Sequence, residues 1–397
     1  MSEEFKEKLR RYGEGTLPEE DRDEVERELE KMEAYQAYLD DLMGEEESGS
    51  GTMKSMDTGK TKGRKPHKEK KIIRRGKWRA RVSNTLTVIS AFLIILIISS
   101  ILSAIFYSTG DRSEKYPDVV SSAIAVSQPN TSVNLSSGTG PFFSMHLTGK
   151  IRKEVGDEQI TIGDYSMKLL FGWARIFSYS YTDENKGSIY NFVYPQDDQS
   201  AENSIYNNSE WERLEKLPEG TVAEAYLSFN KLYTTDETLK KFEAKNLQPV
   251  WFVADTGSQT RGSFRNDLLG FPYQPIWHKD DMKVIQESKE KRGWFGGVTS
   301  RSSVSPSVES FGDGELRNEN FLKTLKLIQE YKSIGKRVIP FIDLDESISY
   351  LEKNGVNLYG AVVTGPVKEL LKLQEEEWVS SMHVGEVRLW NWQDRKN

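Results

Sequence analysis

The chain has 397 residues, enough for two or three domains, with a formal net charge of −7 and no cysteine. The lack of cysteine excludes a disulfide framework, so a domain outside the cell must be held together by its own core. The charge is segregated: residues 1–47 hold 18 acidic and 7 basic residues, whereas residues 48–81 hold 2 acidic and 13 basic residues.

Residues 1–43 predict a helical arm. Phe5, Leu9 and Tyr12 recur at helical spacing, Gly13 and Gly15 end this first helix, and Pro18 opens a second one. Neither helix can bury its apolar stripe alone. Two interpretations stay open: a small hairpin that solvates a membrane anchor, or an arm whose stripe docks on a partner. The stripe comprises Phe5, Leu9, Tyr12, Val25, Leu29, Met32 and Leu39.

Residues 44–81 predict a linker that is first flexible and then polybasic. Residues 44–64 are rich in Gly and Ser and lack periodicity. Gly59-Lys60-Thr61 resembles the end of a phosphate-binding loop, but it lacks the upstream glycine and strand, so we exclude nucleotide binding. Residues 62–81 predict attraction to anionic lipid, and nucleic-acid binding is excluded because only Trp78 accompanies the basic residues. The predicted membrane-flanking residues are Arg74, Arg75, Lys77, Trp78, Arg79, Arg81 and Tyr107.

Residues 86–107 predict a transmembrane helix. No charged residue lies between Arg81 and Asp111, and 22 residues of helix span about 33 Å, which matches a hydrocarbon core of about 30 Å. The Lys/Arg-rich flank predicts a cytoplasmic N-terminus and an extracellular C-terminus. The apolar run starts too far into the chain, and is too long, for a cleaved signal peptide.

Residues 111–220 predict an extracellular β-rich segment. Runs of β-branched or aromatic residues bounded by Gly, Asn or Pro indicate strands. The predicted strands are Ser121–Val133, Gln159–Ile162, Arg175–Tyr181 and Ser188–Tyr194.

Residues 221–397 predict an extracellular α+β domain of ferredoxin-like type, in which strands alternate with helices. A capping box at Thr234–Glu237 starts the first helix, and a long irregular stretch covers residues 255–317. The predicted strands are Val222–Phe229, Pro249–Ala254, Leu358–Val363 and Val384–Trp392. The other predicted helices contain Phe321–Ile328, Ser347–Lys353 and Pro366–Glu377.

No residue pattern predicts an enzyme, a cofactor or a metal site. The four histidines have no metal-ligand spacing. Asp343 and Asp345 follow a predicted apolar strand at Val338–Ile342, as in aspartate-dependent phosphatases, but a helix cap explains them more simply. The turn predicted at Thr364–Pro366 either binds an anion through its backbone N–H groups or has only a structural role. Trp390 and Trp392 belong either to the core or to a surface that binds a ligand.

The arm resembles the helical domain of bacterial anti-sigma factors. The resemblance rests on Tyr12, the run Leu17–Asp21, Val25 and Leu29. In that family the helices clamp an extracytoplasmic-function sigma factor, and many members bind zinc through His and Cys. This chain has no Cys, and its first His is His67, so the resemblance is to the zinc-free version.

The outer region resembles the sigma-factor regulator family of Bacillus-type bacteria. The motifs that carry this resemblance are Leu217–Ser228 (LPEGTVAEAYLS), Leu269–Pro272 (LGFP), Tyr350–Pro366 and Val384–Trp392. These motifs occur in the order that the family has. The chain also shares the family's arrangement of an arm, a basic flank and a span. Residues 48–81 are longer and more basic than the family pattern, which leaves the identity of the sigma factor open.

The hypothesis is therefore a single-pass membrane anti-sigma factor that sequesters an extracytoplasmic-function sigma factor through its stripe and represses its regulon. Its partners are the sigma factor and membrane lipid, and the outer domain works either alone or with a second small membrane protein, as the resemblance implies. The alternative is a signal-anchored envelope protein whose outer domain binds or senses a wall component or partner protein.

Overall fold

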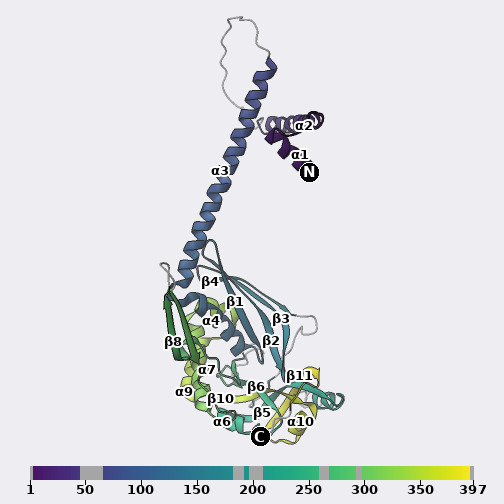
Figure 1. The fold of residues 1–397 in the computed structure, drawn as a ribbon. Helices are drawn as coiled ribbons and strands as arrows, with labels where there is room; N and C mark the ends of the chain where they lie inside the picture. Colours follow the sequence, from purple (N-terminus) through teal and green to yellow (C-terminus); the bar gives the residue numbers. More distant parts are fainter. Residues whose placement is uncertain are drawn as a thin grey trace. The chain divides into compact units, whose positions relative to one another are not determined.

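The computed structural model describes residues 3–44, 66–181, 192–195, 209–258, 268–291 and 297–393 (Figure 1). The chain divides into two compact units, Met1–Ala80 and Arg81–Asn397, and each is described on its own. The predicted flexible tether at residues 44–64 lies outside the described residues, apart from Gly44.

The two predicted arm helices are confirmed. Helix α1 spans Glu3–Glu14 and helix α2 spans Glu19–Gly44. Gly15 follows α1 with a φ of 79°, a conformation that glycine adopts without steric cost. Lys8 on α1 forms ion pairs of 3.0 Å with Asp21 and with Glu24 on α2, and these hold the two helices together.

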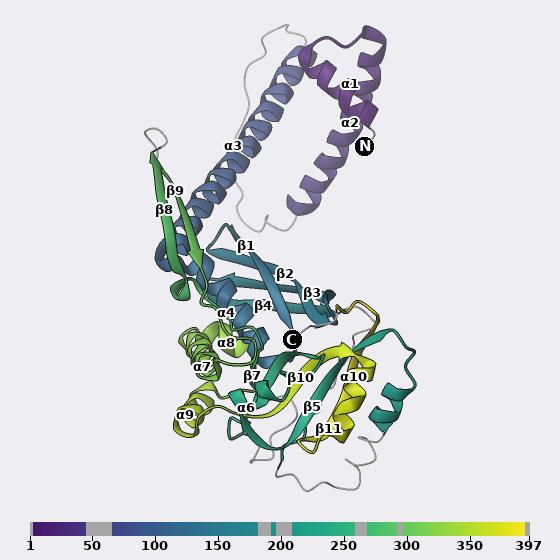
Figure 2. The same cartoon turned by 60° about the horizontal axis from the view of Figure 1, so that its bottom comes forward.

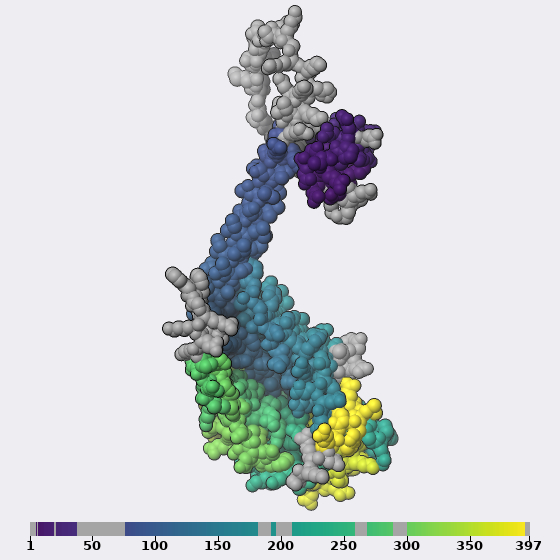
Figure 3. Space-filling model, viewed as in Figure 1, coloured from purple at the N-terminus to yellow at the C-terminus, as the bar shows by residue number. Residues whose placement is uncertain are grey.

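The predicted span lies within helix α3, which runs from Pro66 to Ser108 without a break. Among the described residues, one helix is long and apolar enough to cross a membrane, and it contains this segment. Large apolar side chains of this segment, among them Leu86, Phe92 and Ile98, are exposed, and Figure 3 shows the blue helix meeting the teal strands at one end. The polybasic residues just before the span therefore continue the same helix.

Helix α3 turns directly into the core of residues 111–397, which we call the outer region after its predicted side of the membrane. A short 3₁₀ turn, η1 (Thr109–Asp111), contains Gly110 and Asp111 at positive φ and leads into helix α4, Arg112–Ser127. The predicted strand at Ser121–Val133 is therefore mostly wrong. Residues 116, 119, 120, 123 and 124 form a buried helical stripe, and that burial overrides the β-propensity of the valines and isoleucine.

A four-stranded antiparallel sheet follows α4, in the order β1-β2-β3-β4. Its strands are β1 Ser132–Gly140, β2 Ser144–Val155, β3 Glu158–Leu170 and β4 Trp173–Tyr181. The strands predicted at Gln159–Ile162 and Arg175–Tyr181 are confirmed as parts of β3 and β4. Of the strand predicted at Ser188–Tyr194, residues 188–191 lie outside the described residues and residues 192–194 are not in a strand.

The C-terminal region forms a five-stranded antiparallel sheet in the order β11-β5-β10-β6-β7 (Figure 2). Its strands are β5 Thr221–Thr234, β6 Gln248–Ala254, β7 Gly270–Pro272, β10 Asn357–Pro366 and β11 Val379–Leu389. The four strands predicted here are confirmed, although β11 starts and ends earlier than expected. The predicted α+β class is confirmed.

Helices pack around this sheet. They are α6 Thr235–Lys240, α7 Gly314–Glu330, α8 Lys332–Val338, α9 Leu344–Asn354 and α10 Val367–Leu371, and the 3₁₀ turn η5 covers Lys372–Glu375. The capping box at Thr234 and Glu237 is confirmed. The helix predicted through Glu377 is correct only to Leu371, beyond which the chain tightens into η5.

Two predictions in this region are wrong. The apolar strand expected at Val338–Ile342 is absent from the described structure, because Val338 ends α8 and Pro340 interrupts the run. Such short apolar runs do not distinguish a strand from a buried helix end. The stretch at 255–317 is not irregular throughout, since β8 (Lys283–Lys291) and β9 (Gly297–Val304) form a hairpin. Val284 and Ile285 are exposed, and none of the hairpin side chains that the structure describes is buried, so its sequence shows no clear alternation.

One hydrophobic core joins both sheets of the outer region. It includes Tyr107 at the end of α3, Ile124 on α4, Leu147 on β2 and Leu227 on β5. Helix α4 is central, because it contacts β1, β7, α7 and α8 (Figure 2). The element that continues from the apolar helix is therefore packed inside the outer region.

Candidate functional site

The arm is a compact hairpin with an apolar seam. Val25 and Leu17 are buried between α1 and α2, and the Tyr12 hydroxyl donates a hydrogen bond of 2.8 Å to Glu26 Oε1. The sequence analysis did not include Leu17 in the stripe. Its position next to Pro18, at the start of α2, is the signal that could have identified it.

The predicted sigma-factor contact residues divide between the seam and the surface. Phe5, Leu9, Tyr12 and Leu29 are half-buried, Val25 is fully buried, and Met32 is exposed. Leu39 lies within α2, and its side chain is outside the described ones. The stripe on α2 thus runs from the closed end of the hairpin onto an open helix face, where Met32 and Tyr35 are exposed.

The basic flank lies on the first part of α3. Lys77, Trp78, Arg79 and Arg81 are exposed there. Arg74 and Arg75 belong to the same helix, but their side chains are outside the described ones. The basic flank therefore lies on the same helix as the apolar segment and immediately precedes it.

The outer end of the apolar helix is gripped by two hairpin turns. We call this the helix-end clamp, and define it as Ser99, Ser103, Phe106, Tyr107, Phe142, Phe143, Phe171 and Gly172. The backbone N–H of Phe142 donates to Ser99 Oγ at 2.6 Å, and that of Phe143 donates to Ser103 Oγ at 2.8 Å. Ser103 is fully buried. Its small side chain lets the turn approach the helix closely.

Aromatic rings complete the helix-end clamp. Phe143 stacks on Phe171 with ring centroids 4.7 Å apart, and Phe106 meets Phe143 edge-on at 5.5 Å. The Tyr107 hydroxyl donates to the backbone carbonyl of Phe143 at 2.8 Å. These contacts fix the end of the span to the β1–β2 and β3–β4 turns, both far away in the sequence.

Tyr107 has a different environment from the membrane-surface one that we expected with Trp78. It is fully buried, and its ring contacts Phe106 and Tyr116 edge-on. Burial raises the pKa of the neighbouring Tyr116 hydroxyl above its usual value. The end of the helix belongs to the outer core.

The clamp contains strained backbone. Phe142, Phe143 and Phe171 have φ values of 58°, 53° and 52°, a left-handed conformation that costs bulky L-residues about 1–2 kcal/mol each. Gly172 follows at 77°, so Phe171 and Gly172 form a two-residue hairpin turn with both residues at positive φ. Such outliers persist where the surroundings over-determine them, and they concentrate at functional sites.

Replacing Gly172 with alanine is expected to destabilise the outer region by about 2 kcal/mol, mainly through the left-handed backbone. A Cβ atom at this position would also lie 2.5 Å from the Tyr116 hydroxyl oxygen. Thermal unfolding of the full chain in detergent measures the effect. Gly138→Ala is the matched control, because no heavy atom lies within 4 Å of its Cβ position. Equal melting temperatures for the two variants would contradict this assignment.

A buried ion pair joins the two sheets. Lys153 on β2 is 3% exposed and Glu224 on β5 is fully buried, and the two form an ion pair of 3.0 Å. Glu224 also accepts hydrogen bonds from Asn130 Nδ2 and the Tyr226 hydroxyl, and from the backbone N–H of Glu386. A fully hydrogen-bonded buried pair fixes the arrangement of the strands that carry it.

The enzyme-like residues have structural roles. Asp343 caps helix α9 by accepting a hydrogen bond from the backbone N–H of Glu346, as predicted. Asp345 is exposed and pairs with Lys332. Thr364 is fully buried in β10, where its hydroxyl accepts from the backbone N–H of Gly156 at 2.7 Å. Residues 364–366 are the last residues of strand β10, so the predicted turn is wrong there and Thr364 has a structural role.

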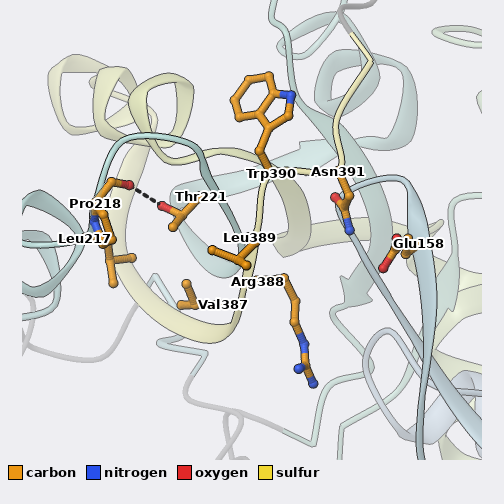
Figure 4. A pocket seen from close by; sticks show the side chains of 9 residues that line it. All are labelled: Glu158, Leu217, Pro218, Thr221, Val387, Arg388, Leu389, Trp390 and Asn391. Atoms are coloured by element: carbon orange, nitrogen blue, oxygen red, sulfur yellow. Dashed lines mark hydrogen bonds between the residues drawn. The ribbon is translucent and has the colours of Figure 1, made fainter.

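The two C-terminal tryptophans differ. Trp392 is buried against Val155 and Val222, whereas Trp390 is 49% exposed. Trp390 lines an open depression of about 540 Å³, with Leu217, Pro218 and Thr221 on one side and Glu158 and Asn391 on the other (Figure 4). Val387, Arg388 and Leu389 complete its lining. Within the described parts of the chain, no cluster of three or more His, Asp or Glu residues could hold a metal ion.

Comparison with known proteins relates both parts of the chain to one family. The model described as "Sigma factor regulator N-terminal" matches residues 70–160, and that described as "Sigma factor regulator C-terminal" matches residues 214–386. The first match holds the apolar helix and Lys153, and the second holds Glu224. No solved structure matches the chain significantly.

A curated relative matches over the whole length. The probable anti-sigma-M factor YhdL of Bacillus subtilis (strain 168) is 25% identical over 401 residues, covering 99% of this chain and 100% of that protein. The family is a regulatory kind of protein, not an enzymatic one. The matches to both of its models and this full-length similarity show that the chain belongs to the sigma factor regulator family.

Proposed function

We propose that this protein is a single-pass membrane anti-sigma factor whose N-terminal arm binds an extracytoplasmic-function sigma factor. The observation that carries the proposal is the full-length similarity to a probable anti-sigma-M factor, which extends through arm, span and outer region alike. The long apolar helix, preceded by a polybasic segment, supports membrane insertion with the arm in the cytoplasm.

The arm would act by steric occlusion. Residues 1–47 carry a net charge of −11, and a protein that contacts DNA and RNA polymerase presents basic surfaces that such an arm complements. The open face of α2 around Leu29, Met32 and Tyr35 would supply the apolar contact. Holding the sigma factor there keeps it from RNA polymerase without any chemical step. Leu39 belongs to the same proposed stripe.

The outer region would hold the signal state and pass it through the span. The helix-end clamp supports this role, since it couples the end of the apolar helix to the core of the outer region. The strand order supports the ferredoxin-like interpretation of the C-terminal sheet. In this sheet β10 lies between β5 and β6, and β5 lies between β10 and β11. The two β-α-β units, β5-α6-β6 and β10-α10-β11, are therefore interleaved, as in that fold.

Leu29→Asp is expected to release the sigma factor and raise expression of its regulon. A carboxylate at an apolar contact loses its hydration, and each 1.4 kcal/mol lost weakens binding about tenfold. The matched control is Ala34→Asp, which adds the same charge to an exposed position roughly on the opposite face of α2. A reporter gene driven by the sigma factor measures the effect, with circular dichroism of the purified chain confirming that helix is retained.

The outcomes separate the hypotheses. Unchanged repression by Leu29→Asp would show that the stripe is not the contact. If the tagged wild-type chain, solubilised in detergent from its own cells, recovers no sigma factor, the alternative of an envelope protein with an outer binding domain is favoured. The exposed Trp390 in the depression of Figure 4 would then be the first surface to test for a wall component.

A further inference from the structure

The tips of the β1–β2 and β3–β4 hairpins reach unusually far along the apolar helix. Ser99, which accepts a hydrogen bond from Phe142, lies 17 residues after Val82, the first residue of the charge-free segment. That distance is about 26 Å along the helix axis, and the hydrocarbon core is about 30 Å thick. A core that begins at Val82 or later therefore still includes Ser99, and a tilted helix keeps Ser99 deeper still.

We infer that these two tips are inserted into the outer leaflet, so that the outer region docks on phospholipid beside its own span. The inference rests on the proposed membrane insertion of α3. We define the leaflet-facing surface as Phe142, Phe171, Trp173 and Ile176. These side chains are 51%, 55%, 63% and 66% exposed, although each is large and apolar. Grouped exposure of this kind marks an interaction surface.

The hydrogen bonding at the β1–β2 tip suits an apolar surrounding. Backbone outside helices is tolerated at membrane depth only where its polar groups find protein partners. The N–H groups of Phe142 and Phe143 are bound by Ser99 and Ser103, and the carbonyl of Phe143 accepts from Tyr107 and from the N–H of Phe171. The serines of the span thus satisfy backbone groups that lipid would leave unpaired.

The charges around the tips suit phospholipid headgroups. Residues 119–153 and 165–182 contain no Asp or Glu, so both tips and the strand segments next to them lack acidic residues. Lys168 and Arg175 are exposed on β3 and β4 just behind the β3–β4 tip, where they can meet lipid phosphates. The opposite end of the sheet carries Glu154, Asp157 and Glu158. This polarity, and continuity with the span, favour a lipid surface over a protein partner.

The test exploits the absence of native cysteine. Phe142→Cys and Phe171→Cys are introduced singly into the full chain, spin-labelled and reconstituted in phospholipid nanodiscs. Ile95→Cys, within the span, is the lipid reference, and Leu389→Cys, on the exposed end of β11, is the aqueous reference. Accessibility to oxygen and to a water-soluble nickel chelate gives the depth of each label. Both tip labels are expected to be lipid-exposed, at a shallower depth than Ile95 and with severalfold less nickel access than Leu389.

Each outcome is informative. Aqueous readings at both tips with a lipid reading at Ile95 would overturn the docking and leave the membrane anchor intact. An aqueous reading at Ile95 itself would overturn the proposed membrane insertion. Exclusion of both oxygen and nickel at the tips would indicate a protein partner there in place of lipid, which also overturns the inference.

A second measurement avoids changes to the clamp residues. Brominated phospholipid should quench the tryptophan fluorescence of the wild-type chain more than that of Trp173→Phe, which removes the exposed ring nearest the β3–β4 tip. Trp390→Phe, far from the tips in the sequence and on the other sheet, is the control and should be quenched as the wild type is. Equal quenching in all three proteins would contradict insertion of the β3–β4 tip.

Discussion

Glu224→Ala is expected to lower the free energy of unfolding by about 3–5 kcal/mol, because it leaves the Lys153 ammonium buried without its counter-charge. Lys153 is 3% exposed, and its ammonium also donates a hydrogen bond of 2.9 Å to the uncharged Tyr226 hydroxyl. Urea unfolding of the full chain in detergent, followed by near-UV circular dichroism, measures the change.

A double replacement distinguishes charge isolation from simple loss of packing. Lys153→Met combined with Glu224→Leu removes both charges and keeps apolar volume, and such replacements are often nearly neutral. The double variant is therefore expected to be more stable than Glu224→Ala alone. A double variant that loses as much as the sum of the single losses would contradict the account, since it would show that the two residues act independently.

The control for this ion pair shares strand β2 with it. Lys150 on β2 pairs with Asp164 on β3 at 2.7 Å, but both side chains are more than half exposed. Asp164→Ala is expected to change stability by no more than about 1 kcal/mol. Lys153 lies in the part of the chain that matches the N-terminal family model, and Glu224 lies in the part that matches the C-terminal one. Glu224→Ala should therefore unfold these two parts together.

The sequence predicted the elements that have a strong period of their own. The span, the two arm helices and the strands around Val222–Phe229 and Leu358–Val363 follow from local apolar patterns, and the structure contains them. Helix α4 was missed because its β-branched composition was weighed above its spacing. Tyr116, Val119, Val120 and Ala123 already follow the helical repeat, so this error lay in the interpretation.

The helix-end clamp could not be predicted in the same way. Ser99 and Ser103 are visible as polar residues in the span, but their partners lie about 40 residues later in the chain. Gly140, Pro141 and Gly172 mark the two turns, but phenylalanine occupies three positive-φ positions where glycine or asparagine is expected. The sequence does contain an indication of the Lys153–Glu224 pair. Glu224 lies inside the apolar strand β5, and a carboxylate there requires a buried partner.

Trp251→Ala is expected to destabilise the outer region by about 3–5 kcal/mol, the usual cost of removing a large buried aromatic side chain. Trp251 is 1% exposed on β6, and its indole N–H donates to the carbonyl of Ala125 on α4 at 2.8 Å. Differential scanning calorimetry of the full chain in detergent measures the change. Trp390→Ala, at a half-exposed tryptophan, should stay within about 0.5 kcal/mol of the wild type.

Trp251→Phe isolates the hydrogen bond to α4, because phenylalanine keeps most of the packing and loses the donor. The expected loss is smaller, about 0.5–1.5 kcal/mol for the hydrogen bond. Since α4 continues from the apolar helix through η1, this variant loosens the joint between the C-terminal sheet and the span while the fold persists. If the outer region controls the arm, reporter expression should shift in Trp251→Phe although the chain remains folded. Unchanged expression, together with the expected small loss in stability, would show that this joint supports the fold and carries no signal.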